Sequence, residues 1–144
     1  MHFVVDGMNV IGSRPDGWWR DRPGARRRLV AELSAWAAGR EGTELTVVFD
    51  GRPQGDEADA AAAQGVTARF APGGPDAADQ AIVALVGGLP DPAAVTVVTS
   101  DAALAAAVGR QGAAVEGVGA FRRRLSAPRT EGDTEGRTAS DELA

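Results

Sequence analysis

Three short runs along the chain consist almost entirely of apolar and β-branched residues. They are Phe3–Asp6, Leu45–Asp50 and Val95–Ser100. A strand covered on both faces of a parallel sheet shows this continuous pattern, whereas a half-exposed strand alternates. We therefore predict that these runs are central strands. Two weaker runs, Val66–Phe70 and Ala113–Val118, are bounded by Gly or Pro and suit the edges of the same sheet.

Segments with helical spacing separate these strands. The longest begins near Pro23, a favoured first-turn residue, ends near Gly39, and has its apolar positions at Leu29, Val30, Leu33, Trp36 and Ala37. Two shorter helices are expected at 76–86 and 101–108, and the alanine-rich stretch 58–63 suits a brief one. The alternation predicts an α/β fold: a mainly parallel sheet of about five strands with helices on both faces.

The chain of 144 residues fits one domain, which we place at residues 1–125. From Ser126 onward it contains a single Leu and no aromatic residue. So little apolar surface cannot offset the entropy of ordering, and a disordered polar tail is expected at 126–144.

Composition excludes several kinds of chemistry. Cysteine is absent and all 15 basic residues are Arg, which leaves no thiolate site, Walker A lysine or Schiff base. The single His2 lies about 13 Å from Asp6 along an extended strand, so no histidine-dependent triad or base is expected. Metal-activated water is the remaining route to hydrolysis. The sequence contains no cysteine, no signal-peptide pattern and no apolar run long enough to span a bilayer. We therefore expect a cytoplasmic location and no membrane partner.

Each central strand ends on an aspartate or one residue before one. Asp6, Asp50 and Asp101 follow the three apolar runs. The carboxyl ends of parallel strands share one edge of a sheet, and ligands of open α/β sheets bind there. These carboxylates therefore define a candidate site. The alternative for each one is that it caps the following helix.

A fourth carboxylate, Asp79, falls in the first turn of the helix expected after Asp76. The alternative is again a helix-capping role, with Asp76 at the cap and Asp79 favoured by the helix dipole. Crowded carboxylates repel each other, and a divalent cation offsets the repulsion. Because all the ligands are oxygens, Mg²⁺ or Mn²⁺ is expected rather than zinc, with Asp6, Asp79 and Asp101 as ligands.

Five motifs in order resemble the NYN-domain proteins of the YacP-like type: DGMNVIGSRPDGWWRDRPGARRRLVAEL, VVFDGRP, ADQAIVALV, VVTSDAAL and GVGAFRRRL. The resemblance covers roughly residues 1–125. It implies a PIN-like fold, metal-dependent RNA cleavage and a role in bacterial RNA processing or decay. The matching site positions are Asp6, Asn9, Asp50, Asp79, Ser100 and Asp101. The sequence departs from the family at Gln80, where many relatives have a second Asp, which removes one carboxylate and puts a full two-metal arrangement in doubt.

RNA contacts are expected in the loop that contains Trp18 and Trp19. An exposed Trp stacks on bases while neighbouring guanidinium groups hold phosphates, here from Arg14, Arg20 and Arg22. Arg122, outside this loop, is a further candidate for RNA binding. One of the two Trp side chains is instead expected to pack the loop onto the core. The clusters 26–28 and 122–124 are interpreted as solvated helix faces.

The sequence thus predicts a metal-dependent ribonuclease that acts on RNA, with the ribosome or the RNA-decay machinery as further partners. An RNA-binding or regulatory module of the same fold, with weak or no cleavage, is the alternative, motivated by Gln80. A phosphate-ester hydrolase acting on small molecules would use the same carboxylate chemistry.

Overall fold

A computed structural model describes residues 1–127, and its centre is a parallel sheet of five strands. The order across the sheet is β3-β2-β1-β4-β5, and every neighbouring pair runs parallel. The strands are β1 (His2–Asp6), β2 (Glu44–Asp50), β3 (Val66–Ala71), β4 (Val95–Val98) and β5 (Ala114–Glu116). The predicted mainly parallel sheet, with its three central and two edge strands, is confirmed.

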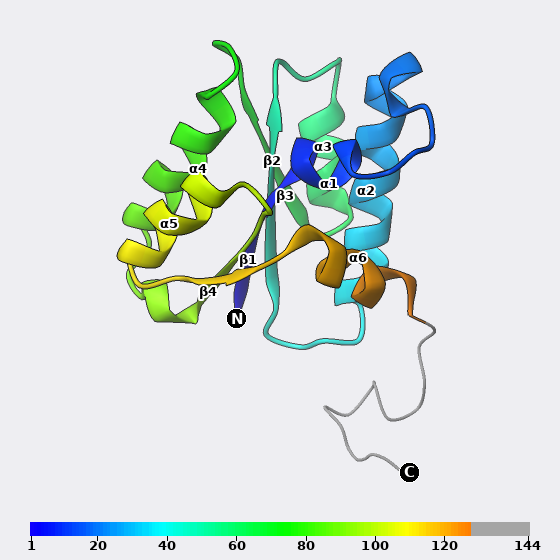
Figure 1. Cartoon of the computed structure of the whole chain (residues 1–144). Helices are drawn as coiled ribbons and strands as arrows, with labels where there is room; N and C mark the ends of the chain where they lie inside the picture. Colours follow the sequence, from blue (N-terminus) through cyan, green and yellow to red (C-terminus); the bar gives the residue numbers. More distant parts are fainter. Residues whose placement is uncertain (128–144) are drawn as a thin grey trace.

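Helices cover both faces of the sheet (Figure 1). One face carries α1 (Gly7–Gly12), α2 (Arg22–Ala37), α3 (Glu57–Ala63) and α6 (Val118–Ser126). The other face carries α4 (Ala77–Gly87) and α5 (Ala102–Arg110). Two short 3₁₀ turns, Trp18–Arg20 and Pro92–Ala94, complete the described elements. The predicted helices after Pro23, after Asp76 and after Asp101 are confirmed as α2, α4 and α5.

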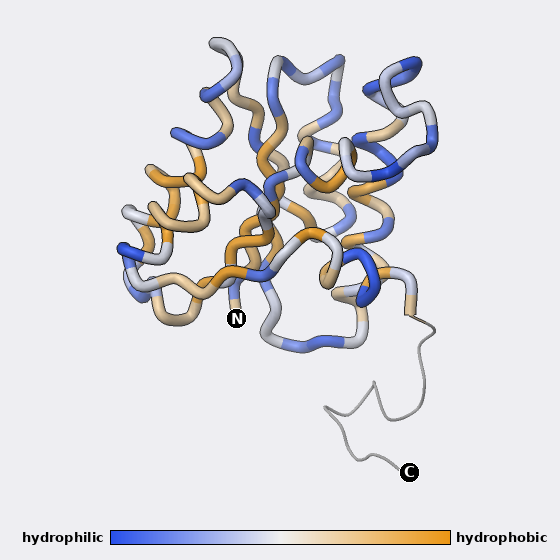
Figure 2. The backbone as a smooth tube through the Cα atoms, viewed as in Figure 1, coloured by the Kyte–Doolittle hydropathy of each residue, from blue (hydrophilic) through white to orange (hydrophobic). Residues whose placement is uncertain are grey.

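Successive strand residues point into separate cores because side chains alternate across a sheet. Val5 belongs to the core under α2 and α6, together with Leu29 and Phe121. Its neighbour Val4 belongs to the core under α4 and α5. Both residues are fully buried, which explains why β1 has no alternating pattern. Figure 2 shows the hydrophobic colour concentrated in the strands and the hydrophilic colour in many of the connecting loops.

The chain changes direction across the sheet after β3. β2 and then β3 add on one side of β1, and α4 then leads the chain to β4 on the other side of β1. The strand order therefore reverses between β1 and β4, which is where ligands bind in open α/β sheets. At this place Asp6 ends β1, and Thr99, Ser100 and Asp101 follow β4.

Two helices differ from the expectation. The six-residue α1 begins directly after β1, where no helix was predicted. A Cβ atom on Gly7 would lie 2.5 Å from the ring of Phe49, so only glycine lets α1 begin this close to β2. The second is α6, which begins at Val118, where the expected edge strand ends; β5 itself is only three residues long.

The polar tail expected at 126–144 lies almost wholly outside the described residues, which end at Ala127, one residue beyond α6. Within residues 1–127, none of the helices combines the length and the apolar character that crossing a bilayer requires.

Candidate active site at the carboxyl edge of the sheet

Asp6 is the most enclosed polar group at this edge, with only 6% of the residue exposed. Its Oδ2 accepts a hydrogen bond of 2.8 Å from the hydroxyl of Thr99, which itself is 1% exposed. The same hydroxyl oxygen accepts the backbone N–H of Asp101 at 3.1 Å. Thr99 thus joins the predicted site residues of β1 and β4. We did not anticipate its role, although a hydroxyl at the end of an apolar strand was the available signal.

The pKa of Asp6 is raised to about 6. Burial is the main cause, because it removes water from the charged form. The hydrogen bond from Thr99 opposes the rise, and the carboxylates of Asp79, Asp50 and Asp101 add to it. The fold therefore brings the predicted carboxylates near enough to act on one another, at a cost in free energy to the ionised state.

The pKa values of Asp79 and Asp50 are also raised, although both side chains are more exposed than that of Asp6. The pKa of Asp79, in the first turn of α4, is raised by burial and then by the charges of Asp101, Asp76 and Asp50. The pKa of Asp50, at the end of β2, is raised by burial and lowered by the nearby guanidinium of Arg22. Asp76 occupies the cap position of α4 but its side chain makes no capping hydrogen bond.

The other predicted site residues hold the strand ends together. Asp101 caps α5, because its Oδ1 accepts the N–H of Leu104 at 2.9 Å. Asn9 accepts the N–H of Ser100 at 2.7 Å, and the Ser100 hydroxyl accepts the N–H of Val118 at 2.9 Å. Asp101 therefore does cap α5 through one of its oxygens. A role in the site stays a prediction for Asp101, as it does for Asn9 and Ser100.

Metal ligation at this edge is limited by geometry. Among residues 1–127, no three His, Cys, Asp or Glu side chains are placed so that together they could hold one ion. The donor set still suits a hard cation, because Asp6, Asp79 and Asp101 offer only carboxylate oxygens. Mg²⁺ commonly binds through one or two carboxylates and keeps several waters. The donor atoms are thus of the kind that a hydrated Mg²⁺ or Mn²⁺ ion binds, but within residues 1–127 they do not form a closed protein cage.

A groove of about 540 Å³ opens between α4 and α5 beside Asp79. Gln80 lines it together with small apolar side chains, among them Ala84 and Ala103. The residue that departs from the family pattern therefore faces a space next to the candidate site and lies one position from Asp79.

In the loop that contains Trp18 and Trp19, one indole packs against the core and the other is exposed. Trp18 packs against the main core and carries the guanidinium of Arg22 at 5.0 Å from its ring centre. Trp19 is 55% exposed and lies beneath Arg20 at 5.6 Å. The expectation that one Trp fastens the loop to the core is confirmed. Since Arg22 acts on Asp50, this loop also lies at the carboxyl edge.

The remaining predicted RNA contacts already have partners. Arg14 pairs with Glu32 at 2.7 Å, and Arg122 donates to the backbone oxygen of Ser13 at 3.0 Å. Their guanidinium groups therefore have structural tasks. A role in RNA binding stays a prediction for both.

Arg26 contradicts the interpretation of the cluster 26–28 as a solvated face. It is 7% exposed, and its Nε and Nη2 donate to the two carboxylate oxygens of Glu57 at 2.5 and 3.0 Å. The pair connects α2 with α3, and the guanidinium lies over the rings of Phe49 and Phe70. The cause of the misassignment is a long-range partner 31 residues away, which a local charge pattern does not reveal.

Comparisons with known proteins agree with this architecture. The chain matches the family model of the YacP-like NYN domain over residues 3–142. The crystal structure of Rae1 (YacP) from Bacillus subtilis is similar at 25% identity and a TM-score of 0.68, covering 87% of this chain and 73% of that one. Its W164L mutant gives 24% identity and a TM-score of 0.65, covering 87% and 74%. No curated protein matches. Together with the parallel sheet, the match over nearly the whole sequence shows that the chain belongs to the YacP-like NYN domain family.

Proposed function

We propose that this protein is a metal-dependent ribonuclease that hydrolyses RNA phosphodiesters at the carboxyl edge of β1 and β4. The family is of ribonuclease type. The observation that carries the proposal is Asp6, a nearly buried carboxylate whose pKa is raised to about 6, partly by the charges of three other aspartates at the point where strand order reverses. Perturbed carboxylates gathered in such a place are typical of catalytic sites.

The proposed cofactor is Mg²⁺ or Mn²⁺, with Asp6, Asp79 and Asp101 as the groups that would hold it, in part through water. When bound, the ion activates water and neutralises charge on the phosphate. Thr99 fixes one oxygen of Asp6, and within residues 1–127 the other oxygen accepts no side-chain hydrogen bond. The capping bond from Leu104 fixes the orientation of Asp101 in the same way.

RNA is the proposed substrate because the only aromatic side chain among residues 1–127 that is strongly exposed lies at this edge. Trp19 offers a face for a base, while Arg20 and Arg22 offer positive charge for phosphates. We further propose a cytoplasmic location, with the ribosome or the RNA-decay machinery presenting the substrate.

Labelled single-stranded and structured RNAs, incubated with the purified protein in Mn²⁺ or in chelator, test this function. We expect cleavage in Mn²⁺ and none in chelator, together with a rise in thermal stability when Mn²⁺ is titrated in, because the ion relieves repulsion among the carboxylates. Intact RNA under both conditions, with no stabilisation by Mn²⁺, would refute the proposal.

An RNA-binding or regulatory module is the second candidate. It is favoured by Gln80 in place of a carboxylate and by the lack of three carboxylates, among the described residues, within reach of one ion. This candidate predicts RNA binding that is retained in chelator and no cleavage with either metal. The same incubation, read by mobility shift as well as by cleavage, separates the two candidates.

Two neighbouring aspartates in α4 provide a matched comparison. We expect Asp79→Asn to reduce cleavage about 10- to 100-fold, since Asp79 is coupled to Asp101 and belongs to the proposed ion site. Asp76→Asn removes the same charge three positions earlier from an exposed side chain that makes no capping bond. It should leave cleavage nearly unchanged. Equal rates in both variants and the wild type would remove Asp79 from the site.

A further inference from the structure

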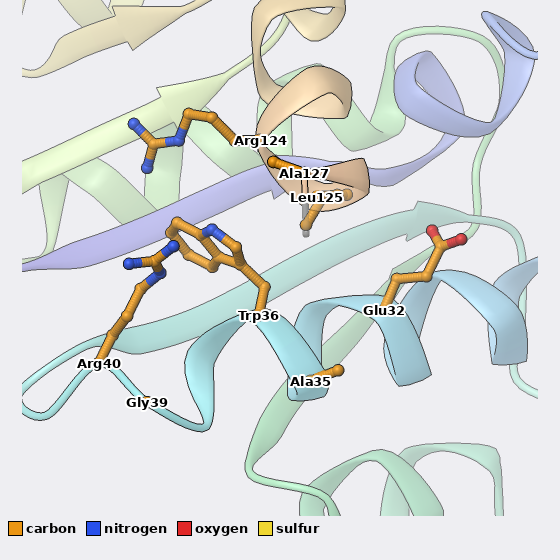
Figure 3. A pocket seen from close by; sticks show the side chains of 8 residues that line it. All are labelled: Glu32, Ala35, Trp36, Gly39, Arg40, Arg124, Leu125 and Ala127. Carbon is orange, nitrogen blue, oxygen red and sulfur yellow. The ribbon is translucent and has the colours of Figure 1, made fainter. Parts of the chain in front are cut away.

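A second pocket lies at the opposite edge of the sheet from the aspartates, between the last turns of α2 and α6. It has a volume of about 340 Å³. Figure 3 shows its lining, which includes the indole of Trp36, the guanidinium groups of Arg40 and Arg124, and the apolar side chains of Leu125 and Ala127. The pocket shares no residue with the candidate active site.

Trp36 is held rigidly in the wall of this pocket. It is 8% exposed, and the rings of Phe3 and Phe121 contact it edge to face, with centroids 5.1 and 5.4 Å away. Arg40 and Arg124 lie over the indole at 4.7 and 5.1 Å from its centre. No base can therefore stack on this indole, and what it offers to a ligand is the N–H on its edge.

Two hydrogen-bond donors here lack a partner. The indole Nε1 of Trp36 and the Nε of Arg40 are both buried, and neither has an acceptor within the described part of the chain. A buried donor without an acceptor costs about 1–3 kcal/mol, and an acceptor from outside the chain, such as an ordered water or an anion, is one way to satisfy it. Figure 3 shows the indole nitrogen on the ring edge toward Leu125 and Ala127.

The charge of the pocket favours an anion. Arg124 has a carboxylate partner, Glu116, only at the long distance of 3.5 Å. Glu32 also lines the pocket, but its carboxylate is engaged by Arg14 at 2.7 Å. Among the residues that line the pocket, the guanidinium of Arg40 has no ion pair in the described structure, so the excess charge is positive.

We propose that this pocket binds the phosphate group of a nucleotide, either free or at the end of an RNA strand. A phosphate presents acceptor oxygens in several directions, which suits the indole N–H and the two guanidinium groups, whereas a carboxylate presents only two oxygens in one plane. The volume exceeds that of a phosphate and leaves room for the nucleoside along Ala35, Leu125 and Ala127. The proposal does not depend on catalysis at the aspartates.

Nuclear magnetic resonance of the indole N–H groups in the full chain tests the proposal. The three Trp residues give three signals, and Trp36→Phe identifies the one from Trp36. Uridine 5′-monophosphate, inorganic phosphate, uridine and succinate are titrated separately in chelator at constant ionic strength. We expect the two phosphates to shift the Trp36 signal saturably while the other indoles stay unchanged, and uridine to have no effect.

Charge-matched variants establish the site. Arg40→Gln and Arg124→Gln should each weaken binding of uridine monophosphate at least tenfold, whereas Arg110→Gln, on the exposed end of α5 across the sheet, should not change it. A 5′-phosphorylated tetranucleotide that binds more tightly than the mononucleotide would identify an RNA end as the ligand, and the reverse order would identify the free nucleotide. A Trp36 signal that no phosphate moves, equal affinity in Arg40→Gln and Arg110→Gln, or succinate binding as tight as phosphate would each overturn the proposal.

Discussion

Asp6→Asn is expected to abolish metal-dependent cleavage, by about 100-fold or more, while making the protein more stable at pH 7. Activity falls because the substitution removes the most enclosed ligand of the proposed ion. Stability rises because the ionised carboxylate of Asp6 is held in the fold against burial and against the charges of Asp79, Asp50 and Asp101. Asn keeps an oxygen to accept the Thr99 hydroxyl and carries no charge.

The pH dependence gives the sign and size of this stabilisation. The folded pKa of about 6 lies above the ordinary value of 3.8. Well below the ordinary pKa of 3.8 both states are protonated and Asp6 costs nothing. Between pH 4 and 6 the unfolded chain loses its proton while the folded chain keeps it, so stability falls as pH rises through this range. The full loss, on the order of 3 kcal/mol, is present above pH 6.

Denaturant unfolding of wild type and Asp6→Asn at pH 4 and at pH 7 measures this directly. The free energies of unfolding of the two proteins should differ little at pH 4, and Asp6→Asn should be the more stable protein at pH 7. Asp101→Asn is the control, since Asn caps a helix nearly as well as Asp; it should lose cleavage with little change in stability. A less stable Asp6→Asn protein at pH 7, with cleavage intact, would contradict both roles given to Asp6.

Arg26→Met is expected to cost about 3–5 kcal/mol of stability. The substitution leaves the carboxylate of Glu57, whose side chain is 7% exposed, without its bidentate partner. In the wild-type protein the pKa of Glu57 is lowered. Burial by itself would raise this pKa, but the hydrogen bonds from Arg26 and from the Gln54 N–H outweigh the effect of burial. The pair therefore stabilises the fold above the ordinary pKa of Glu57 and loses this contribution as acid protonates it.

Urea unfolding of Arg26→Met, Arg28→Met and a double variant distinguishes the contribution of this buried pair from that of an ordinary surface charge. Arg28→Met removes an exposed charge from the same helix and should change stability by less than about 0.5 kcal/mol. The double variant Arg26→Met, Glu57→Leu should recover most of the loss, because replacing both partners removes the unpaired buried charge. If Arg26→Met and Arg28→Met prove equally mild, the pair makes no structural contribution.

The sheet was predictable from sequence because its signal is local and strong. The run Leu45–Asp50 is buried on both faces, so nearly every side chain is apolar and no helix pattern competes with it. The place of Asp6, Asp50 and Asp101 at one edge followed from parallel pairing alone. That Asp6 is nearly buried did not follow, because burial is set by tertiary contacts such as the hydrogen bond from Thr99, 93 residues away in the chain.

The elements that escaped prediction have weak or misleading local signals. The helix α1 is six residues long, has no capping side chain and starts directly after a strand, so nothing marks its beginning. In α6 the spacing of Val118, Phe121 and Leu125 was a usable helical signal, but Gly117 and Gly119 on either side of Val118 resemble a turn. The Arg26–Glu57 pair is a tertiary contact and has no signature in either segment alone.

The hydrogen bond between Thr99 and Asp6 also sets the order of events during synthesis. Of the five strands β1 is translated before the others, yet the carboxylate of Asp6 stays without its Thr99 partner until β4 has been translated and has docked beside β1. The long crossover through α4 must close before this docking, and such distant pairings form late in folding. On the proposed function, a nascent or truncated chain that lacks residues 95–101 has no assembled nuclease centre. On the same proposal, the topology delays the onset of RNA cleavage until residues 95–101 have been translated.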